Sequence, residues 1–152
     1  MKIWVDADAC PGPVRDVLLR ASQRLKVPTV FVANRALSLP RSELVSTVQV
    51  GAGLDVADQH IATSAQKGDL AVTQDIPLAA LLVPRGVVVL DPRGELFTDE
   101  NISERLSVRN FMQELRESGV TTGGPSGFSA QDKQRFAAAL DRELSRLLRE
   151  RK

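Results

Sequence analysis

The sequence contains few of the residues that form disulfides, bind zinc or stack on nucleic-acid bases. One cysteine, Cys10, excludes an internal disulfide, and one histidine, His60, leaves no cysteine–histidine cluster for zinc. Aromatic residues make up 4% of the chain, with no tyrosine and one tryptophan, which weakens the case for the base-stacking surface of single-strand binders. The core must therefore be built mainly from aliphatic side chains.

Charge of one sign and long apolar segments are also missing. The 20 lysines and arginines nearly balance the 19 aspartates and glutamates, and the formal net charge of +1 by itself indicates neither a nucleic acid nor a membrane as partner. No segment is long and apolar enough to span a membrane, and residues 1–6 lack the apolar core of a signal peptide. We therefore expect a cytoplasmic protein with no membrane partner.

What the sequence does contain is an alternation of short aliphatic segments and helical patterns. Its 152 residues, 43% of them apolar, suit a single domain over 1–152, with the sheet core in 1–92 and a helical part in 93–152. Apolar residues recur at helical spacing in 14–25, 55–67 and 77–83. The remaining aliphatic segments predict five strands, at residues 3–5, 29–33, 46–50, 70–73 and 86–90. We expect an α/β fold of three layers, α/β/α, around a mainly parallel five-stranded sheet.

The last third of the sequence predicts two helices joined by a glycine-rich loop at residues 121–127. The first helix has an apolar stripe that ends before Gly119: Val108, Phe111, Met112 and Leu115. The second begins at a capping-box pattern of Ser129 and Asp132, and its apolar line is Phe136, Leu140, Leu144, Leu147 and Leu148. We expect both helices to pack onto the sheet.

Two features of this region also have a simple interpretation. The pair Gly123-Gly124 could cradle a phosphate, but a connector between helices is the better prediction. The basic end of the chain is expected to be a solvated face that could steer a polyanion: Arg142, Arg146, Arg149, Arg151 and Lys152.

Acidic residues follow several of the predicted strands. Aspartates come after the first, third and fourth strands: Asp6, Asp8, Asp55, Asp58 and Asp75. In a parallel sheet these strand ends meet at one edge, where ligands bind in open α/β folds. Carboxylates gathered there would repel one another unless protons or a cation offset their charge. Hard divalent ions such as Mg²⁺ and Mn²⁺ prefer oxygen ligands, so we expect all five aspartates to be metal ligands.

The chemistry that suits such a site is cleavage of a phosphoester, in which one metal activates water and another stabilises the leaving oxygen. Asn34 and Arg35 follow the second strand and are candidates for contacts to the phosphate backbone.

Each aspartate also has a simpler interpretation. Asp6 and Asp8 could cap the following helix, Asp55 is a good helix cap, and Asp75 could start a turn before Pro77. These roles do not explain why separate strands deliver acids to one edge. Cys10 is expected to be a small buried residue rather than a nucleophile, and His60 an exposed or half-buried helix residue.

Four motifs carry a resemblance to a known family: Val5-Asp6-Ala7-Asp8-Ala9-Cys10-Pro11, Asp55-Val56-Ala57-Asp58, Thr73-Gln74-Asp75-Ile76-Pro77-Leu78-Ala79-Ala80 and Thr122-Gly123-Gly124-Pro125. Together they resemble the bacterial YaiI/YqxD family over essentially the whole chain. That family is functionally uncharacterised and is grouped by fold with the PIN-like nucleases. The resemblance therefore implies a PIN-like fold more firmly than an activity.

PIN domains are metal-dependent ribonucleases with an acid after the first strand, acids on a helix, and a Thr/Ser-x-Asp at a later strand end. Asp6, Asp58 and the Thr73-x-Asp75 pair match these positions. The sequence departs from the pattern in doubling the first acid, as Asp6 and Asp8, and in carrying aspartates where the helix usually has glutamate. Both departures affect the expected metal geometry.

Three functions are compatible with these residues. The leading hypothesis is a Mg²⁺- or Mn²⁺-dependent nuclease acting on RNA or single-stranded nucleic acid, with these catalytic residues: Asp6, Asp8, Asp58, Thr73 and Asp75. The second is a haloacid-dehalogenase-like phosphatase, because Asp-x-Asp after a first strand opens that superfamily, with Asp6 as nucleophile and Asp8 as acid/base. The third is a metal- or nucleic-acid-binding module without turnover.

Overall fold

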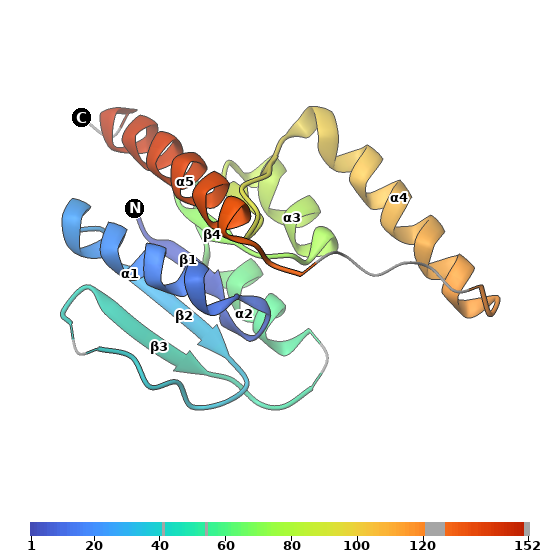
Figure 1. Ribbon diagram of the computed structural model, residues 1–152, viewed down its shortest axis with the longest axis horizontal. Helices are drawn as coiled ribbons and strands as arrows, with labels where there is room; N and C mark the ends of the chain where they lie inside the picture. Colours follow the sequence, from blue (N-terminus) through green and yellow to red (C-terminus); the bar gives the residue numbers. More distant parts are fainter. Residues whose placement is uncertain (41, 54, 121–126, 151–152) are drawn as a thin grey trace.

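The computed structural model describes residues 1–40, 42–53, 55–120 and 127–150. Within these ranges a six-stranded sheet lies at the centre of the molecule, in the order β3-β2-β1-β4-β5-β6 (Figure 1). The strands are β1 (Ile3–Asp6), β2 (Thr29–Ala33), β3 (Val45–Gln49), β4 (Leu70–Val72), β5 (Val88–Leu90) and β6 (Leu96–Phe97). The helices are α1 (Gly12–Leu25), α2 (Val56–Ser64), α3 (Ile76–Leu82), α4 (Asp99–Glu117) and α5 (Ala130–Glu150), with short 3-10 helices η1 (Ala7–Ala9) and η2 (Val83–Arg85).

The five predicted strands are all present and run parallel, so their carboxyl ends lie along one edge of the sheet. The sixth strand, β6, was not predicted. It pairs antiparallel with β5 after a tight turn in which the Asp91 carboxylate accepts the backbone N–H groups of Arg93 and Glu95. Because β6 has only two residues, no alternating pattern in the sequence could reveal it.

The two faces of the sheet are covered by different helices, as expected for three layers. Along β1, Ile3 and Val5 join the core beneath α1 and α5, whereas Trp4 joins the core beneath α2 and α3. This alternation follows from the two-residue period of a strand. Figure 1 shows α1 and α5 side by side on one face. Both cores consist mainly of aliphatic side chains, as the composition predicts.

The two C-terminal helices behave differently. α5 packs onto the sheet and α1, and its apolar residues Phe136, Leu140 and Leu144 are at most 1% exposed. α4 contacts α3 and then extends away from the rest of the molecule (Figure 1). The stripe expected to pack onto the sheet does not do so, since Val108 is 52% and Phe111 is 58% exposed. A stripe at helical spacing predicts a helix, but it does not identify what covers the helix.

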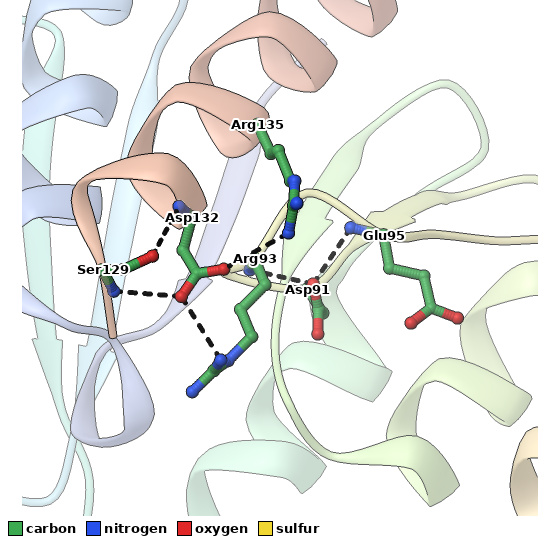
Figure 2. A network of polar contacts seen from close by, with 6 residues as sticks. All are labelled: Asp91, Arg93, Glu95, Ser129, Asp132 and Arg135. Carbon is green, nitrogen blue, oxygen red and sulfur yellow. Dashed lines mark hydrogen bonds and ion pairs between the residues drawn. The ribbon is translucent and has the colours of Figure 1, made fainter. Parts of the chain in front are cut away.

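The start of α5 is fixed by the capping box that the sequence predicts. The Ser129 N–H donates to Asp132 Oδ2 at 3.0 Å, and the Asp132 N–H donates to Ser129 Oγ at 3.1 Å. The same carboxylate also accepts a hydrogen bond from Arg93, in the β5–β6 turn (Figure 2). Asp132 therefore joins α5 to the edge of the sheet.

Other predictions for the C-terminal part have mixed outcomes. Gly123-Gly124, Arg151 and Lys152 lie outside the described residues, so the predictions for them stay untested. Along α5, Arg142 and Arg149 are exposed and Arg146 is half-buried. Arg142 and Arg146 both pair with the buried Glu143. None of the helices in the described ranges is long and apolar enough to cross a membrane.

Candidate functional site

Asp6 and Thr73 lie at the ends of two neighbouring parallel strands. Val5 of β1 is paired with Val72 of β4, so the residues that follow them are side by side. Thr73 Oγ1 donates a hydrogen bond to Asp6 Oδ2 at 3.1 Å and accepts one from the Asp75 N–H at 3.0 Å. Both side chains are buried, Thr73 at 1% exposure and Asp6 at 8%. One threonine thus links the acid after the first strand to the backbone of the acid after the fourth.

Asp75 also begins helix α3. Its Oδ1 accepts the Leu78 N–H at 2.9 Å, which is the hydrogen bond of a helix N-cap. Asp75 therefore has a structural role, but as a helix cap and not as the start of the turn that its simpler interpretation predicts. The cap uses one oxygen, and the Asp75 carboxylate also lies close enough to that of Asp58 to raise the pKa of Asp58.

Asp55, Asp58 and Asp75 bring their carboxylates together. One oxygen from each residue lies within 4.8 Å of the other two. Asp55 occupies the N-cap position of α2, but its side chain makes no capping hydrogen bond. Its backbone is in the left-handed region, with φ of 66°, which is unfavourable for a residue with a side chain. Helix capping therefore does not account for the Asp55 carboxylate.

The clustered carboxylates lack enough nearby positive charge to offset their mutual repulsion, and the pKa values of two of the acids at this edge are raised. The pKa of Asp58 is raised to about 8. Burial is the largest cause, followed by the hydrogen bond and charge of Asp75 and then by the charges of Asp6 and Asp55. The pKa of Asp6 is also raised, mainly by burial, against the opposing hydrogen bond from Thr73. A cation or a proton bound here would lower the free energy of the folded state.

Asp8 lies near this group but has other partners. Its Oδ2 accepts the Asn34 N–H at 2.8 Å, and its Oδ1 is 3.8 Å from Arg35 Nε. The charge of Asp8 still contributes to raising the pKa of Asp6, so the two carboxylates are neighbours. The structure thus brings Asn34 and Arg35 to Asp8, and it brings Asp55, Asp58 and Asp75 to one another.

The capping interpretation of Asp6 and Asp8 does not describe their contacts. The N-cap of α1 is Pro11, and no side chain caps that helix. Asp6 precedes η1 and also makes no capping hydrogen bond. The carboxylates of both residues are directed instead to the ends of the adjacent strands, β4 for Asp6 and β2 for Asp8.

His60 is half-buried on a helix, as the sequence predicts, whereas Cys10 is less buried than predicted. Cys10 is half-buried, and burial raises the pKa of its thiol to about 12, which keeps the thiol protonated and a poor nucleophile. His60 is half-buried on α2, and its ring meets the Trp4 ring edge-on with centroids 6.1 Å apart.

Sequence reasoning missed two residues at this edge. Gln74 Nε2 donates to the Ala9 carbonyl at 2.9 Å, which joins the end of β4 to η1. Asp91 follows β5 at the same edge, but its carboxylate is occupied by the turn described above. The sequence Asp91-Pro92-Arg93-Gly94 is a turn signal, which could have identified this structural role.

Comparisons with known proteins find a family and close relatives that cover nearly the whole chain. Residues 4–146 match the model of a family described as "Uncharacterized BCR, YaiI/YqxD family". A protein of Myxococcus xanthus is 82% identical over 149 residues, which cover 98% of this chain and 97% of the relative. A protein of Syntrophobacter fumaroxidans is 57% identical over 146 residues, covering 96% of this chain and 95% of the relative. Both are named UPF0178 protein, a name that states no activity. No solved structure matches the chain.

Proposed function

The chain belongs to the YaiI/YqxD family, whose function is not established, and we propose that it is a Mg²⁺- or Mn²⁺-dependent nuclease acting on RNA or single-stranded nucleic acid. One observation carries the proposal. Three carboxylates from the starts of α2 and α3 have oxygens within 4.8 Å of one another. The resemblance of the sequence motifs to those of PIN-like nucleases supports the same interpretation for two of these acids, Asp58 and Asp75.

The donor set suits a hard divalent cation. All three groups offer oxygen, which Mg²⁺ and Mn²⁺ prefer. Asp58 lies in the first turn of α2, and Asp55 and Asp75 are the N-cap residues of α2 and α3. Asp55 has no capping role that would occupy its carboxylate. A bound cation would supply the positive charge that activates water and stabilises the leaving oxygen of a phosphodiester.

The protein's own residues would orient the site and handle protons. Thr73 holds Asp6 by a hydrogen bond and fixes the backbone of Asp75. Asp6 is buried and its pKa is raised, which suits a group that ligates the cation or accepts a proton from the attacking water. Asp75 is anchored to α3, so its carboxylate cannot turn freely.

The phosphatase alternative is less well supported by the contacts of Asp8. As an acid/base, Asp8 would have to be free to exchange a proton with the leaving group. Its two oxygens instead face the Asn34 N–H, at 2.8 Å, and the Arg35 guanidinium, at 3.8 Å, so neither is directed at an open substrate position. A binding module without turnover uses the same acids, and the experiment below separates it from the nuclease.

The test combines cation binding with cleavage. Purified protein is titrated with Mn²⁺ while its thermal unfolding is followed, and then incubated with single-stranded RNA. Three proteins are compared: wild type, Asp58→Asn, and the control Asp141→Asn, which makes the same charge change at an exposed pair with Arg24. Stabilisation and cleavage in wild type and the control, with both lost in Asp58→Asn, support the proposal.

The other outcomes decide against it. Cleavage that is equal in wild type and Asp58→Asn indicates a contaminating nuclease. Stabilisation by Mn²⁺ without cleavage favours the binding module. No stabilisation at millimolar Mn²⁺ or Mg²⁺ excludes a functional metal site.

A further inference from the structure

The doubled acid after β1 is divided between two neighbouring strands. Asp6 is hydrogen-bonded to Thr73, beyond the end of β4, and Asp8 is hydrogen-bonded to the Asn34 backbone, beyond the end of β2. β1 lies between β2 and β4 in the sheet, so the Asp6 and Asp8 carboxylates are directed to opposite sides of β1. This geometry separates their roles.

Asp8 fixes the backbone at the point where β2 ends. A carboxylate that accepts a backbone N–H at 2.8 Å makes a charge-assisted hydrogen bond, which is stronger than a neutral one. Because Asn34 is the first residue after β2, this bond sets the direction in which the chain leaves the sheet. The next residue, Arg35, is therefore held beside the carboxyl edge.

The Arg35 side chain lies near Asp8 but remains largely exposed to solvent. Its Nε is 3.8 Å from Asp8 Oδ1, while the side chain as a whole is 63% exposed. A guanidinium has five N–H donors in a planar fork, so this loose pair leaves donors for another acceptor. Phosphate oxygens match that fork, often with two parallel hydrogen bonds.

The positive charge of Arg35 can offset the repulsion between the acidic site and a polyanionic substrate. Asp6, Asp55, Asp58 and Asp75 would repel a polyanionic substrate, and Asp8 has its oxygens directed at Asn34 and Arg35 rather than at the three clustered carboxylates. Arg35 offers positive charge next to Asp8, at the end of β2, which is the strand beside the one that ends at Asp6. It can bind a phosphate of the chain without competing for the metal ligands.

We propose that Asn34-Arg35 forms a phosphate-binding subsite for single-stranded nucleic acid, and that Asp8 is the positioning residue of this subsite and not a metal ligand. The proposal rests on the proposed nuclease function for its catalytic consequences. The subsite itself is independent of the metal, because none of its contacts involves Asp55, Asp58 or Asp75.

The experiment measures RNA affinity and Mn²⁺ affinity separately. Binding of a fluorescent oligouridylate is measured in EDTA at several salt concentrations, and Mn²⁺ binding is measured without RNA. The variants are Asp8→Ala, Asp8→Asn, Arg35→Ala, the double variant Asp8→Ala/Arg35→Ala, and Asp58→Asn. Asp8→Asn keeps an acceptor for the Asn34 N–H, so it serves if Asp8→Ala fails to fold.

Arg35→Ala is expected to weaken RNA binding about 10-fold and to reduce the slope of log affinity against log salt by about 0.7, the value for one phosphate contact on a single strand. Asp8→Ala should weaken RNA binding by several-fold and leave Mn²⁺ affinity within about 2-fold of wild type. In the Arg35→Ala background the Asp8→Ala change should have no further effect on RNA binding, because Asp8 acts through Arg35. In the cleavage assay both variants should raise KM more than they lower kcat.

Three results would overturn the inference. One is a loss of Mn²⁺ affinity in Asp8→Ala as large as in Asp58→Asn, which would make Asp8 a ligand. The second is an unchanged salt slope in Arg35→Ala, and the third is additive effects in the double variant. Failure of wild type to bind Mn²⁺ would instead contradict the proposed function, while the measurements in EDTA would still test the subsite.

Discussion

Asp6 and Asp69 are both buried aspartates beside the central strands, and they lie at opposite ends of the sheet. Asp69 precedes β4 and is 7% exposed, and its carboxylate accepts the backbone N–H groups of Lys2 and Gln66 and the Trp4 Nε1–H, at 2.9 to 3.0 Å. Asp6 ends β1 and is 8% exposed, but the structure gives its carboxylate one donor, Thr73, and the charges of Asp75 and Asp8 nearby. The two aspartates are buried to nearly the same extent, but Asp69 is surrounded by hydrogen-bond donors and Asp6 lies near other acids.

This difference separates acids that stabilise the fold from the acids of the candidate site. Asp132 resembles Asp69, because Ser129 and two arginines surround it, and the hydrogen bond from the Ser129 N–H is the main reason that its pKa is lowered (Figure 2). At the carboxyl edge, the raised pKa of Asp58 has the reverse cause, burial among other acids. An acid supplied with donors by its own chain stabilises the fold, whereas an acid left among acids requires a cation or a proton from outside.

The largest expected effect is the difference in stability between variants that lack the Asp69 carboxylate and variants that lack the Asp6 carboxylate. Asp69→Ala leaves three donors without their acceptor, one of them the indole of buried Trp4, and should lower the free energy of unfolding by about 3–5 kcal/mol. Asp6→Ala removes repulsion along with one hydrogen bond and should lower it by less than about 1 kcal/mol. Urea denaturation in EDTA measures both. Equal losses would show that Asp6 is as structural as Asp69.

The second largest effect is expected at the contact between α5 and the β5–β6 turn, which Asp132 also joins. Gly94, in the β5–β6 turn, has φ of +92°, and a Cβ there would lie 2.7 Å from the backbone carbonyl of Arg135. Gly94→Ala should therefore lower the free energy of unfolding by about 2–4 kcal/mol, because neither backbone can yield easily. Gly119→Ala is the matched control, with φ of +84° and open space around it, and should cost about 1 kcal/mol. Similar midpoints in chemical denaturation for the two variants would mean that α5 can move away from the turn.

The third effect is the pH dependence of the acidic edge. Because the pKa of Asp58 is raised to about 8 in the folded state, the folded protein binds more protons than the unfolded chain between about pH 4 and pH 8. The free energy of unfolding of the metal-free protein should therefore fall as the pH rises through this window, by about 1 kcal/mol once solvent screening is allowed for. Thermal unfolding in EDTA should show this decline in wild type and a smaller one in Asp58→Asn, where the raised pKa of Asp6 remains.

The same proton competes with the cation. Mg²⁺ affinity should rise with pH up to about 8 and then level off, because the ligand must lose its proton before it binds metal. Titrations with Mg²⁺ between pH 6 and pH 9 measure this. An affinity that does not change with pH would remove Asp58 from the set of ligands.

Only part of the acidic edge could be predicted from the sequence. The strands of the parallel sheet and the convergence of acids at one edge could be predicted, because aliphatic segments that stop at aspartates carry both signals. The division of roles could not. That Asp8 is directed to Asn34 while Asp6 is directed to Thr73 depends on the strand order β2-β1-β4, which the sequence alone did not supply.

α4 presents the same problem in another form. Its stripe predicts the helix, but the partner of a stripe is decided by which faces of the sheet are already covered. Here α2 and α3 cover the face nearest to α4, and Val108 and Phe111 are left exposed.

The smallest expected effect on stability distinguishes the two helix-start aspartates at the acidic edge. Asp75 caps α3 with its side chain, so Asp75→Ala should lower the free energy of unfolding by about 1 kcal/mol. Asp55 occupies the N-cap of α2 with no capping hydrogen bond and a left-handed backbone, so Asp55→Gly should change it by less than about 0.5 kcal/mol. Both should weaken Mn²⁺ binding about 10-fold or more, because each removes an oxygen from the group of three. If Asp55→Gly leaves Mn²⁺ affinity unchanged, the exposed Asp55 is not a ligand, and the cation site reduces to Asp58 and Asp75 with Asp6 beside them.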